Sequence, residues 1–346
     1  MPRLRLAQWA TGNIGTRSLR AVIDHPHLDL VGVHVYAEDK VGLDAGDLCG
    51  RDRTGVLATS ALADIVAVIP DCVLYMARAC DLDEVCALLE AGSNVVTTRG
   101  EFHWPASMDP AARERVEAAC VAGSTSIHST GSSPGFITEA LPLVVTSIQR
   151  RLDRLAIEEF ADLSQRPSPE LLFDIMGFGR PPAPGADADA GRLAHLQASF
   201  GPSLELLADA LSLPLDSLDA TGDLAAATHR TEIAAGVLEA GTVAAQRTTV
   251  SGIRDGHTLL SFSATWYCTK DLDADWDLRD TGWRVRVDGD APLDIDLRFA
   301  IPLDRMAETS PGYTANRAVN AVAAVCAAAP GIRTTVDLPQ IIATLA

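Results

Sequence analysis

Short apolar runs alternate with amphipathic stretches over the first 130 residues of the chain. The apolar runs, expected to be strands, lie at 3–10, 28–36, 71–76, 94–98 and 126–129. The amphipathic stretches, with apolar positions three and four residues apart, lie at 15–25, 81–91 and 110–121. Buried strands that alternate with helices are typical of a parallel sheet covered by helices on both faces. The sequence therefore predicts a doubly wound α/β domain at residues 1–136.

The pattern changes at residue 137. Helices are expected at 137–150 and, as one or two segments, at 192–211. The stretches expected to be strands of a mostly antiparallel sheet lie at 155–160, 226–235, 241–254, 258–269, 283–289 and 292–299. We therefore expect an α+β domain at 137–312, and a last helix at 314–328 within a segment, 313–346, that returns to the first domain.

Composition narrows the functional classes. The 346 residues are 47% hydrophobic, which suits a sizeable core, and the formal charge of −18 argues against a nucleic-acid surface or an anionic membrane. Seven cysteines show neither Cys-x-x-Cys pairs nor zinc-finger spacing, so we expect reduced thiols, no metal and a cytoplasmic protein. The chain has only two lysines, Lys40 and Lys270, which leaves little room for lysine-based catalysis.

The turn after the first strand has the sequence Ala-Thr-Gly-Asn-Ile-Gly at residues 10–15. Small residues allow a pyrophosphate to approach the backbone, and a helix N-terminus offers unpaired N–H groups and a favourable dipole. The motif follows a strand, opens a helix and precedes a second strand, which is the setting of a Rossmann-type dinucleotide site. An ordinary glycine turn is the alternative. The residues expected at the NAD or NADP cofactor here are Thr11, Gly12, Asn13, Ile14 and Gly15.

The end of the second strand bears on the choice of cofactor. Glu38 lies where an acidic residue binds the ribose 2′-hydroxyl of NAD, which favours NAD. Lys40, two residues further on, is placed instead to receive the 2′-phosphate of NADP. Both side chains can equally be solvated loop charges, so the sequence leaves NAD and NADP open.

Ligands of doubly wound sheets lie outside the carboxyl ends of the strands. The loops that follow the strands at 71–76, 94–98 and 126–129 are therefore expected to border the cofactor. The residues of these loops assigned to cofactor binding are Met76, Arg78, Thr98, Arg99, Gly131 and Ser132.

Glu101 is the expected catalytic residue. Enclosure by Phe102, Trp104 and Phe136 would disfavour its charge and allow proton exchange near neutral pH. A surface or helix-capping glutamate is the alternative reading. His103 and His128 are competing proton donors, although each is more typical of a hydrogen-bonded structural histidine.

These motifs together resemble the native amine dehydrogenases, relatives of 2,4-diaminopentanoate dehydrogenase whose N-terminal domain is like that of dihydrodipicolinate reductase. The segments that carry the resemblance are 9–15, 95–98 with Glu101, 131–136, 313–316, 319–321 and 330–332. The resemblance implies NAD(P)H-dependent reductive amination of a ketone or aldehyde with ammonia, the reverse oxidative deamination, and a homodimer. It also implies that Glu101 is the essential carboxylate, and it places Asn316 at the cofactor.

The chain departs from true dihydrodipicolinate reductases at 158–164, where it has neither the histidines nor the lysine of their motif. A dicarboxylate or amino-acid substrate is therefore disfavoured, and a small aliphatic carbonyl compound or amine fits better. The residues expected to line a substrate pocket between the domains are Phe136, Phe173, Met176 and His195. Ordinary core packing is the alternative for Phe173 and Met176.

Two other functions share this scaffold. One is a carbonyl or imine reductase in which Glu101 only orders water, and the other is a dinucleotide-binding protein without turnover. Dependence on ammonium separates the first from an amine dehydrogenase, and the absence of any turnover identifies the second.

Overall fold

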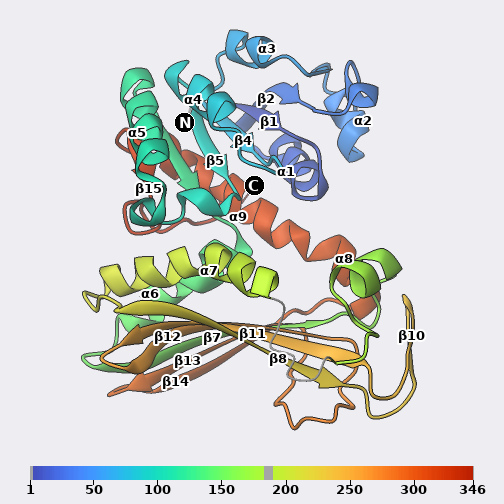
Figure 1. Ribbon diagram of the computed structural model, residues 1–346. Helices are drawn as coiled ribbons and strands as arrows, with labels where there is room; N and C mark the ends of the chain where they lie inside the picture. Colours follow the sequence, from blue (N-terminus) through green and yellow to red (C-terminus); the bar gives the residue numbers. More distant parts are fainter. Residues whose placement is uncertain (1–2, 183–189, 346) are drawn as a thin grey trace. The chain divides into compact units, whose positions relative to one another are not determined.

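The computed structural model describes residues 3–182 and 190–345. The chain divides into two compact units, the first made of Met1–Phe136 and Ser310–Ala346 and the second of Ile137–Thr309 (Figure 1). The first unit is thus discontinuous in sequence, because the C-terminal segment folds with the N-terminal one.

The first unit is built on a seven-stranded sheet with the order β15-β6-β5-β4-β1-β2-β3. Its strands are β1 (Leu4–Trp9), β2 (Leu28–His34), β3 (Ala58–Thr59), β4 (Cys72–Tyr75), β5 (Asn94–Thr97), β6 (Ser126–Ser129) and β15 (Gly331–Arg333). Every neighbouring pair is parallel. The strand order reverses between β1 and β4, so the predicted Rossmann-type sheet is confirmed, and its switch point lies beside the 10–15 turn.

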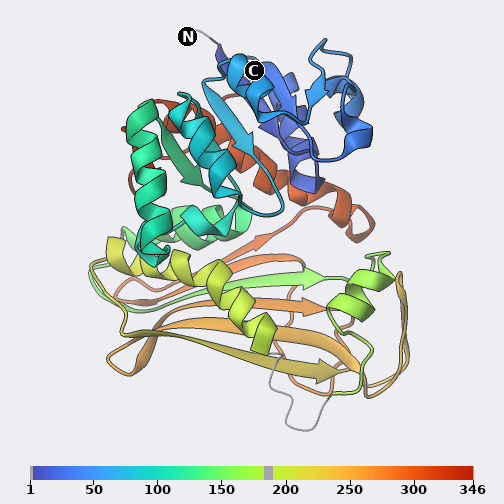
Figure 2. The ribbon, with the colours of Figure 1, turned by 45° about the horizontal axis from the view of Figure 1, so that its top comes forward.

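Helices cover both faces of this sheet (Figure 2). One face carries α1 (Asn13–Asp24) and α9 (Pro311–Cys326), whose Val22 and Val322 share a core with Leu6. The helices on the other face are α3 (Leu62–Ala67), α4 (Leu82–Glu90) and α5 (Pro110–Gly123). Successive side chains of β1 point to opposite faces, so Leu6 lies in one core and Trp9 in the other.

The second unit contains a six-stranded sheet with the order β14-β13-β7-β12-β11-β8. Its strands are β7 (Leu152–Asp162), β8 (Ser217–Ala226), β11 (Val243–Arg254), β12 (His257–Tyr267), β13 (Gly282–Gly289) and β14 (Leu293–Arg298). Only the β7–β12 pair is parallel, which confirms the expected mostly antiparallel sheet. Helix α7 (Ala190–Ala210) packs on the sheet, where the Phe200 ring stacks on Phe262 at 3.9 Å.

Several elements differ from those expected. The predicted strand at 226–235 is instead the end of β8, a loop and part of a small ribbon of β9 (Thr231–Ile233) and β10 (Gly236–Leu238). Strand β8 was missed because it is an edge strand with half-exposed, polar positions. The helix expected at 137–150 begins in a kinked segment, Ser132–Ala140, and continues as α6 (Leu141–Thr146). Three further short helices, α2 (Ala45–Cys49), α3 and α8 (Leu303–Thr309), were not predicted. Within residues 3–182 and 190–345, no helix has the combined length and hydropathy that crossing a bilayer requires.

Candidate active site

The turn between β1 and α1 leaves the start of the helix without a side-chain cap. Gly12 is the N-cap residue and offers no side-chain hydrogen bond, and the first turn of α1 contains no acidic residue. The N–H groups there are therefore available, and the helix dipole is not offset by a local carboxylate. This is the chemistry that a pyrophosphate requires.

Two glycines of the turn have different surroundings. A Cβ at Gly15 would lie 2.1 Å from the Ala10 carbonyl oxygen, whereas a Cβ at Gly12 would meet nothing within 4 Å. Gln8 braces the same carbonyl, because its Nε2 donates to Ala10 O at 2.9 Å and its Oε1 accepts from the Ser18 hydroxyl at 2.7 Å. Gly15 is thus required by the fold, while the space beside Gly12 is open to a ligand. The turn fits a dinucleotide.

Lys40 connects the end of β2 to this turn. It lies in the one-turn helix Glu38–Lys40, and its Nζ donates to both the carbonyl oxygen and Oγ1 of Thr11, each at 3.2 Å. Glu38 is exposed at the start of the same short helix. The two residues weighed for cofactor choice are therefore neighbours, and only Lys40 contacts the turn in the described part of the chain.

An aromatic network fixes Tyr36 just beyond β2. The Tyr36 hydroxyl accepts from Trp9 Nε1 at 2.9 Å and donates to Glu84 at 2.7 Å, and Tyr75 donates to the same carboxylate oxygen at 2.8 Å. The His34 ring stacks on Trp9 at 3.7 Å. Burial raises the pKa of Tyr36 and lowers the pKa of His34. Sequence reasoning missed this network, because Glu84 lies on α4 and its pairing with Tyr36 exists only in the folded sheet.

The loops after β4, β5 and β6 lie together, as their position in a parallel sheet implies. Arg99 donates to the Arg78 carbonyl at 2.6 Å and accepts a hydrogen bond from the Ser129 hydroxyl at its own carbonyl. Thr98 Oγ1 lies 3.6 Å from the Met76 sulfur. The sequence-predicted residues of these three loops are thus brought to one edge of the sheet.

Glu101 belongs to a short 3₁₀ turn, Gly100–Phe102, directly after β5. Its Oε1 lies 2.7 Å from Arg99 Nη2, and its side chain is 42% exposed. The expected enclosure by Phe102 is wrong, because Phe102 is fully buried in the core. Successive side chains of a 3₁₀ turn point about 120° apart, so neighbours on this turn cannot share one environment. The structure therefore gives Glu101 an ion-paired, partly solvated setting.

The other proton-transfer candidates near Glu101 are buried. His103 and His128 are 2% and 0% exposed, and His128 Nδ1 lies 2.7 Å from the Arg333 carbonyl oxygen. Cys80 follows β4, and burial, reinforced by the charge of Glu101, raises its pKa to about 12. Cys80 thus remains a thiol at neutral pH. Of Glu101 and these three candidates, Glu101 is the one with an exposed side chain.

The loop after β6 is shaped by its small residues. A Cβ at Gly135, whose φ is +120°, would lie 2.9 Å from Thr130 Oγ1. The Ser132 and Thr314 hydroxyls lie 2.7 Å apart, and the Arg317 guanidinium lies 6.0 Å from the centre of the Phe136 ring. Helix α9 therefore helps to hold the loop, and Asn316 lies exposed on it. Thr314 was not among the predicted site residues, although it stands in the motif at 313–316.

The residues assigned to substrate have mixed positions within the second unit. Phe173 and Met176 pack against a core cluster that contains Leu172 and Leu238. His195 is exposed on α7. Phe173 and Met176 therefore have a packing role whatever else they do.

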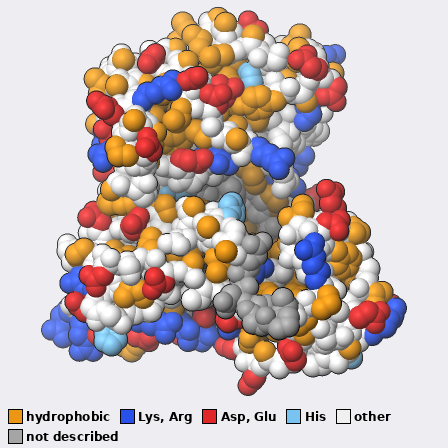
Figure 3. Space-filling model, in the orientation of Figure 1, with side chains coloured by type: hydrophobic (Ala, Val, Ile, Leu, Met, Phe, Trp, Pro, Cys, Tyr) orange, Lys and Arg blue, Asp and Glu red, His pale blue; other side chains and the backbone are white. Residues whose placement is uncertain are grey.

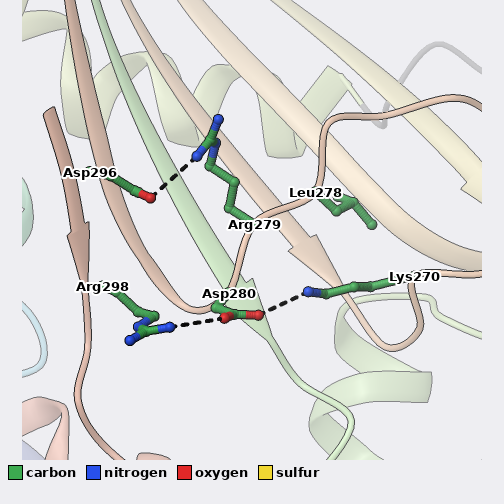
Figure 4. A pocket seen from close by; sticks show the side chains of 6 residues that line it. All are labelled: Lys270, Leu278, Arg279, Asp280, Asp296 and Arg298. Carbon is green, nitrogen blue, oxygen red and sulfur yellow. Dashed lines mark hydrogen bonds and ion pairs between the residues drawn. The ribbon is translucent and has the colours of Figure 1, made fainter. Parts of the chain in front are cut away.

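Two charged hollows occur in the second unit. One, of about 480 Å³, is lined by Lys270, Leu278, Arg279, Asp280, Asp296 and Arg298 (Figure 4). Lys270 and Arg298 converge on Asp280 at 2.9 and 3.8 Å. The other, of about 360 Å³, includes Arg284 and Glu158. Lys and Arg side chains gather along this edge of the unit, over β13 and β14 (Figure 3). Internal ion pairs occupy both hollows, and neither has the glycine turn or helix terminus that suits a dinucleotide.

In the described residues no group of three His, Cys, Asp or Glu is placed to hold a metal ion.

Comparison with known proteins gives a consistent picture. Residues 189–346 match the family model described as the 2,4-diaminopentanoate dehydrogenase C-terminal domain. An amine dehydrogenase of Streptomyces virginiae is 28% identical, and the match covers 96% of this chain and 95% of that protein. The solved amine dehydrogenase of Mycobacterium smegmatis superposes with a TM-score of 0.75 at 18% identity, over 99% of this chain and 97% of that one. A myo-inositol 2-dehydrogenase of Lactobacillus plantarum superposes with a TM-score of 0.52 at 12% identity, over 93% and 89% of the two chains. The two structural matches show the fold alone.

Proposed function

We propose that this chain is an NAD(P)-dependent amine dehydrogenase, as its motifs had indicated and as the match of residues 189–346 to the 2,4-diaminopentanoate dehydrogenase C-terminal domain model supports. The reaction is the reductive amination of a small ketone or aldehyde with ammonia, together with the reverse oxidative deamination. The observation that carries the proposal is the presence of an accessible carboxylate, Glu101, at the same sheet edge as the phosphate-binding turn. The amine dehydrogenase relative supports the substrate class.

Residues of the first unit would hold the cofactor, which supplies the hydride when bound. The N–H groups at residues 12–15 would bind the pyrophosphate, and Thr11 would border the ribose. The residues proposed along the remaining length of the cofactor are Met76, Arg78, Thr98, Arg99, Gly131, Ser132 and Asn316. The pair of hydroxyls at Ser132 and Thr314 would keep the backbone of the loop after β6 in place.

Glu101 would handle the protons of the amination. One of its oxygens is held by Arg99, and in the described residues the other oxygen has no hydrogen-bond partner. The free oxygen can bind ammonium and take one of its protons, which leaves ammonia to attack the carbonyl carbon. The protonated carboxyl can then return the proton to the carbinolamine hydroxyl, which leaves as water. The resulting carboxylate stabilises the iminium cation that accepts hydride.

We propose a small aliphatic carbonyl compound or amine as substrate, with Phe136 as its contact in the first unit. Phe136 is half-buried beside Arg317. We also propose a homodimer, which light scattering on the purified protein tests directly.

Turnover of carbonyl compounds with and without ammonium tests the function. The panel includes cyclohexanone and small aldehydes, with NADH or NADPH as reductant. We expect oxidation of the cofactor to require ammonium. Glu101→Gln should lower kcat by about 10²–10⁴-fold, the usual contribution of a general acid or base, while the Kd of the cofactor changes little.

Glu117→Gln is a matched control, because Glu117 has a side chain 44% exposed and is paired with Arg113 at 2.9 Å. It should behave as the wild type. Equal turnover without ammonium would replace the proposal with a carbonyl or imine reductase. Tight cofactor binding with no turnover on the whole panel would favour a binding protein.

A further inference from the structure

Lys40 carries a positive charge for which the described residues provide no counter-ion. Its Nζ is bonded to two oxygens of Thr11, both uncharged, and none of the described carboxylates lies within ion-pairing distance. The side chain is half-buried in a chain whose formal charge is −18. The other lysine, Lys270, is by contrast paired with Asp280 at 2.9 Å. A partly buried cation without a counter-ion is stabilised by a bound anion.

The position of Lys40 indicates which anion. An ammonium group has three N–H donors, and Thr11 takes two of them, so one remains for a ligand. Thr11 lies within the dinucleotide turn, and Lys40 ends the short helix that begins four residues after β2. In doubly wound sheets the end of this strand meets the adenosine ribose, and its residues distinguish a 2′-hydroxyl from a 2′-phosphate.

We propose that Lys40 binds the 2′-phosphate of NADP(H), and that this chain therefore prefers NADPH to NADH. The inference rests on the proposed dinucleotide site but not on the amine chemistry. The two hydrogen bonds to Thr11 already hold the Lys40 ammonium group at the turn, so little side-chain conformational entropy is lost when the phosphate binds. Glu38 and Asp39 oppose the phosphate, but both are exposed, and water and salt screen their charges.

Equilibrium binding to the intact protein tests the proposal without reference to catalysis. The ligands are NADPH, NADH, adenosine 2′,5′-bisphosphate and adenosine 5′-phosphate, measured by titration calorimetry. Lys40→Met should weaken NADPH and the bisphosphate on the order of 10- to 100-fold, as expected for loss of a charge-assisted hydrogen bond. NADH and adenosine 5′-phosphate should change by less than about threefold, because neither carries a 2′-phosphate. Lys40→Arg should recover part of the loss, since it keeps the charge.

Lys270→Met is the matched control, because it removes the other lysine of the chain, which already has a carboxylate partner (Figure 4). Neither affinity should change in this variant. Lower affinity of Lys40→Met for NADPH and NADH by the same factor would overturn the proposal and make Lys40 a support of the turn. Unchanged affinity for both would overturn it as well. Wild-type protein that binds NADH alone would refute the preference but leave the amine dehydrogenase proposal standing, whereas protein that binds neither cofactor would refute both.

Discussion

Replacing each glycine of the 10–15 turn with alanine separates what the fold needs from what a ligand needs. At Gly15 the new Cβ would lie 2.1 Å from the Ala10 carbonyl oxygen, more than an ångström inside ordinary contact. The carbonyl cannot yield easily, because Gln8 Nε2 holds it through a hydrogen bond of 2.9 Å. At Gly12 the new Cβ would enter open space, and the local φ of −76° suits alanine.

The magnitudes follow from these contacts. Overpacking of this kind destabilises the folded state by about 3 kcal/mol, and the higher helix propensity of alanine offsets about 1 kcal/mol of that loss. Gly15→Ala should therefore lower the free energy of unfolding of the first unit by about 2 kcal/mol, or its melting temperature by about 4–8 °C. Gly12→Ala should cost less than about 1 kcal/mol, the usual effect of a poorer N-cap residue. The same methyl group should weaken dinucleotide binding by more than about tenfold, because it occupies the approach to the helix N-terminus.

Calorimetric unfolding of the ligand-free proteins and cofactor titration measure the two effects independently. We expect Gly15→Ala to unfold at a lower temperature than the wild type. We expect Gly12→Ala to keep nearly wild-type stability but to bind the dinucleotide weakly. Wild-type affinity in Gly12→Ala would refute the placement of the pyrophosphate at this turn. Wild-type stability in Gly15→Ala would refute the argument that Ala10 and Gly15 are in forced contact.

Three further predictions concern the scaffold. Asp44 accepts hydrogen bonds from the N–H groups of Thr54, Gly46 and Gly55, and they hold the pKa of its carboxyl below the ordinary 3.8, although burial opposes them. The charged carboxylate therefore stabilises the folded state above pH 3.8, and this contribution is lost as pH falls through the pKa of the folded state. The deficit of Asp44→Asn in urea unfolding should thus be largest at neutral pH and vanish in acid, and a constant deficit would contradict the reasoning. Phe200→Ala, which removes the ring stacked on Phe262, should cost about 3–5 kcal/mol in the second unit by chemical unfolding. Gly123→Ala should lower the melting temperature measured by circular dichroism, because its Cβ would lie 1.8 Å from the Leu89 carbonyl oxygen; unchanged melting would show that the backbone relaxes there.

The sequence by itself determined the classes of the two units and the place of the dinucleotide turn. Apolar runs of four to nine residues separated by amphipathic helices admit few arrangements besides a doubly wound sheet, and the turn at 10–15 follows its first strand. The pattern of apolar positions did not predict β8 or β15, because an edge strand buries too little apolar surface to give a recognisable pattern. Both strands depend on pairing with partners far along the chain.

Tertiary structure decided which groups meet and which are solvated. Sequence placed Glu101 after a strand but assigned it an apolar enclosure, whereas the 3₁₀ turn directs Phe102 into the core and leaves Glu101 with Arg99. The sequence also left the cofactor choice open between Glu38 and Lys40, with a slight preference for Glu38 and NAD, and only the folded chain brings Lys40 to Thr11. The physical reason is the same in each case. Hydrophobic periodicity reports burial averaged over an element, while a single side chain's partners are set by contacts between elements distant in sequence.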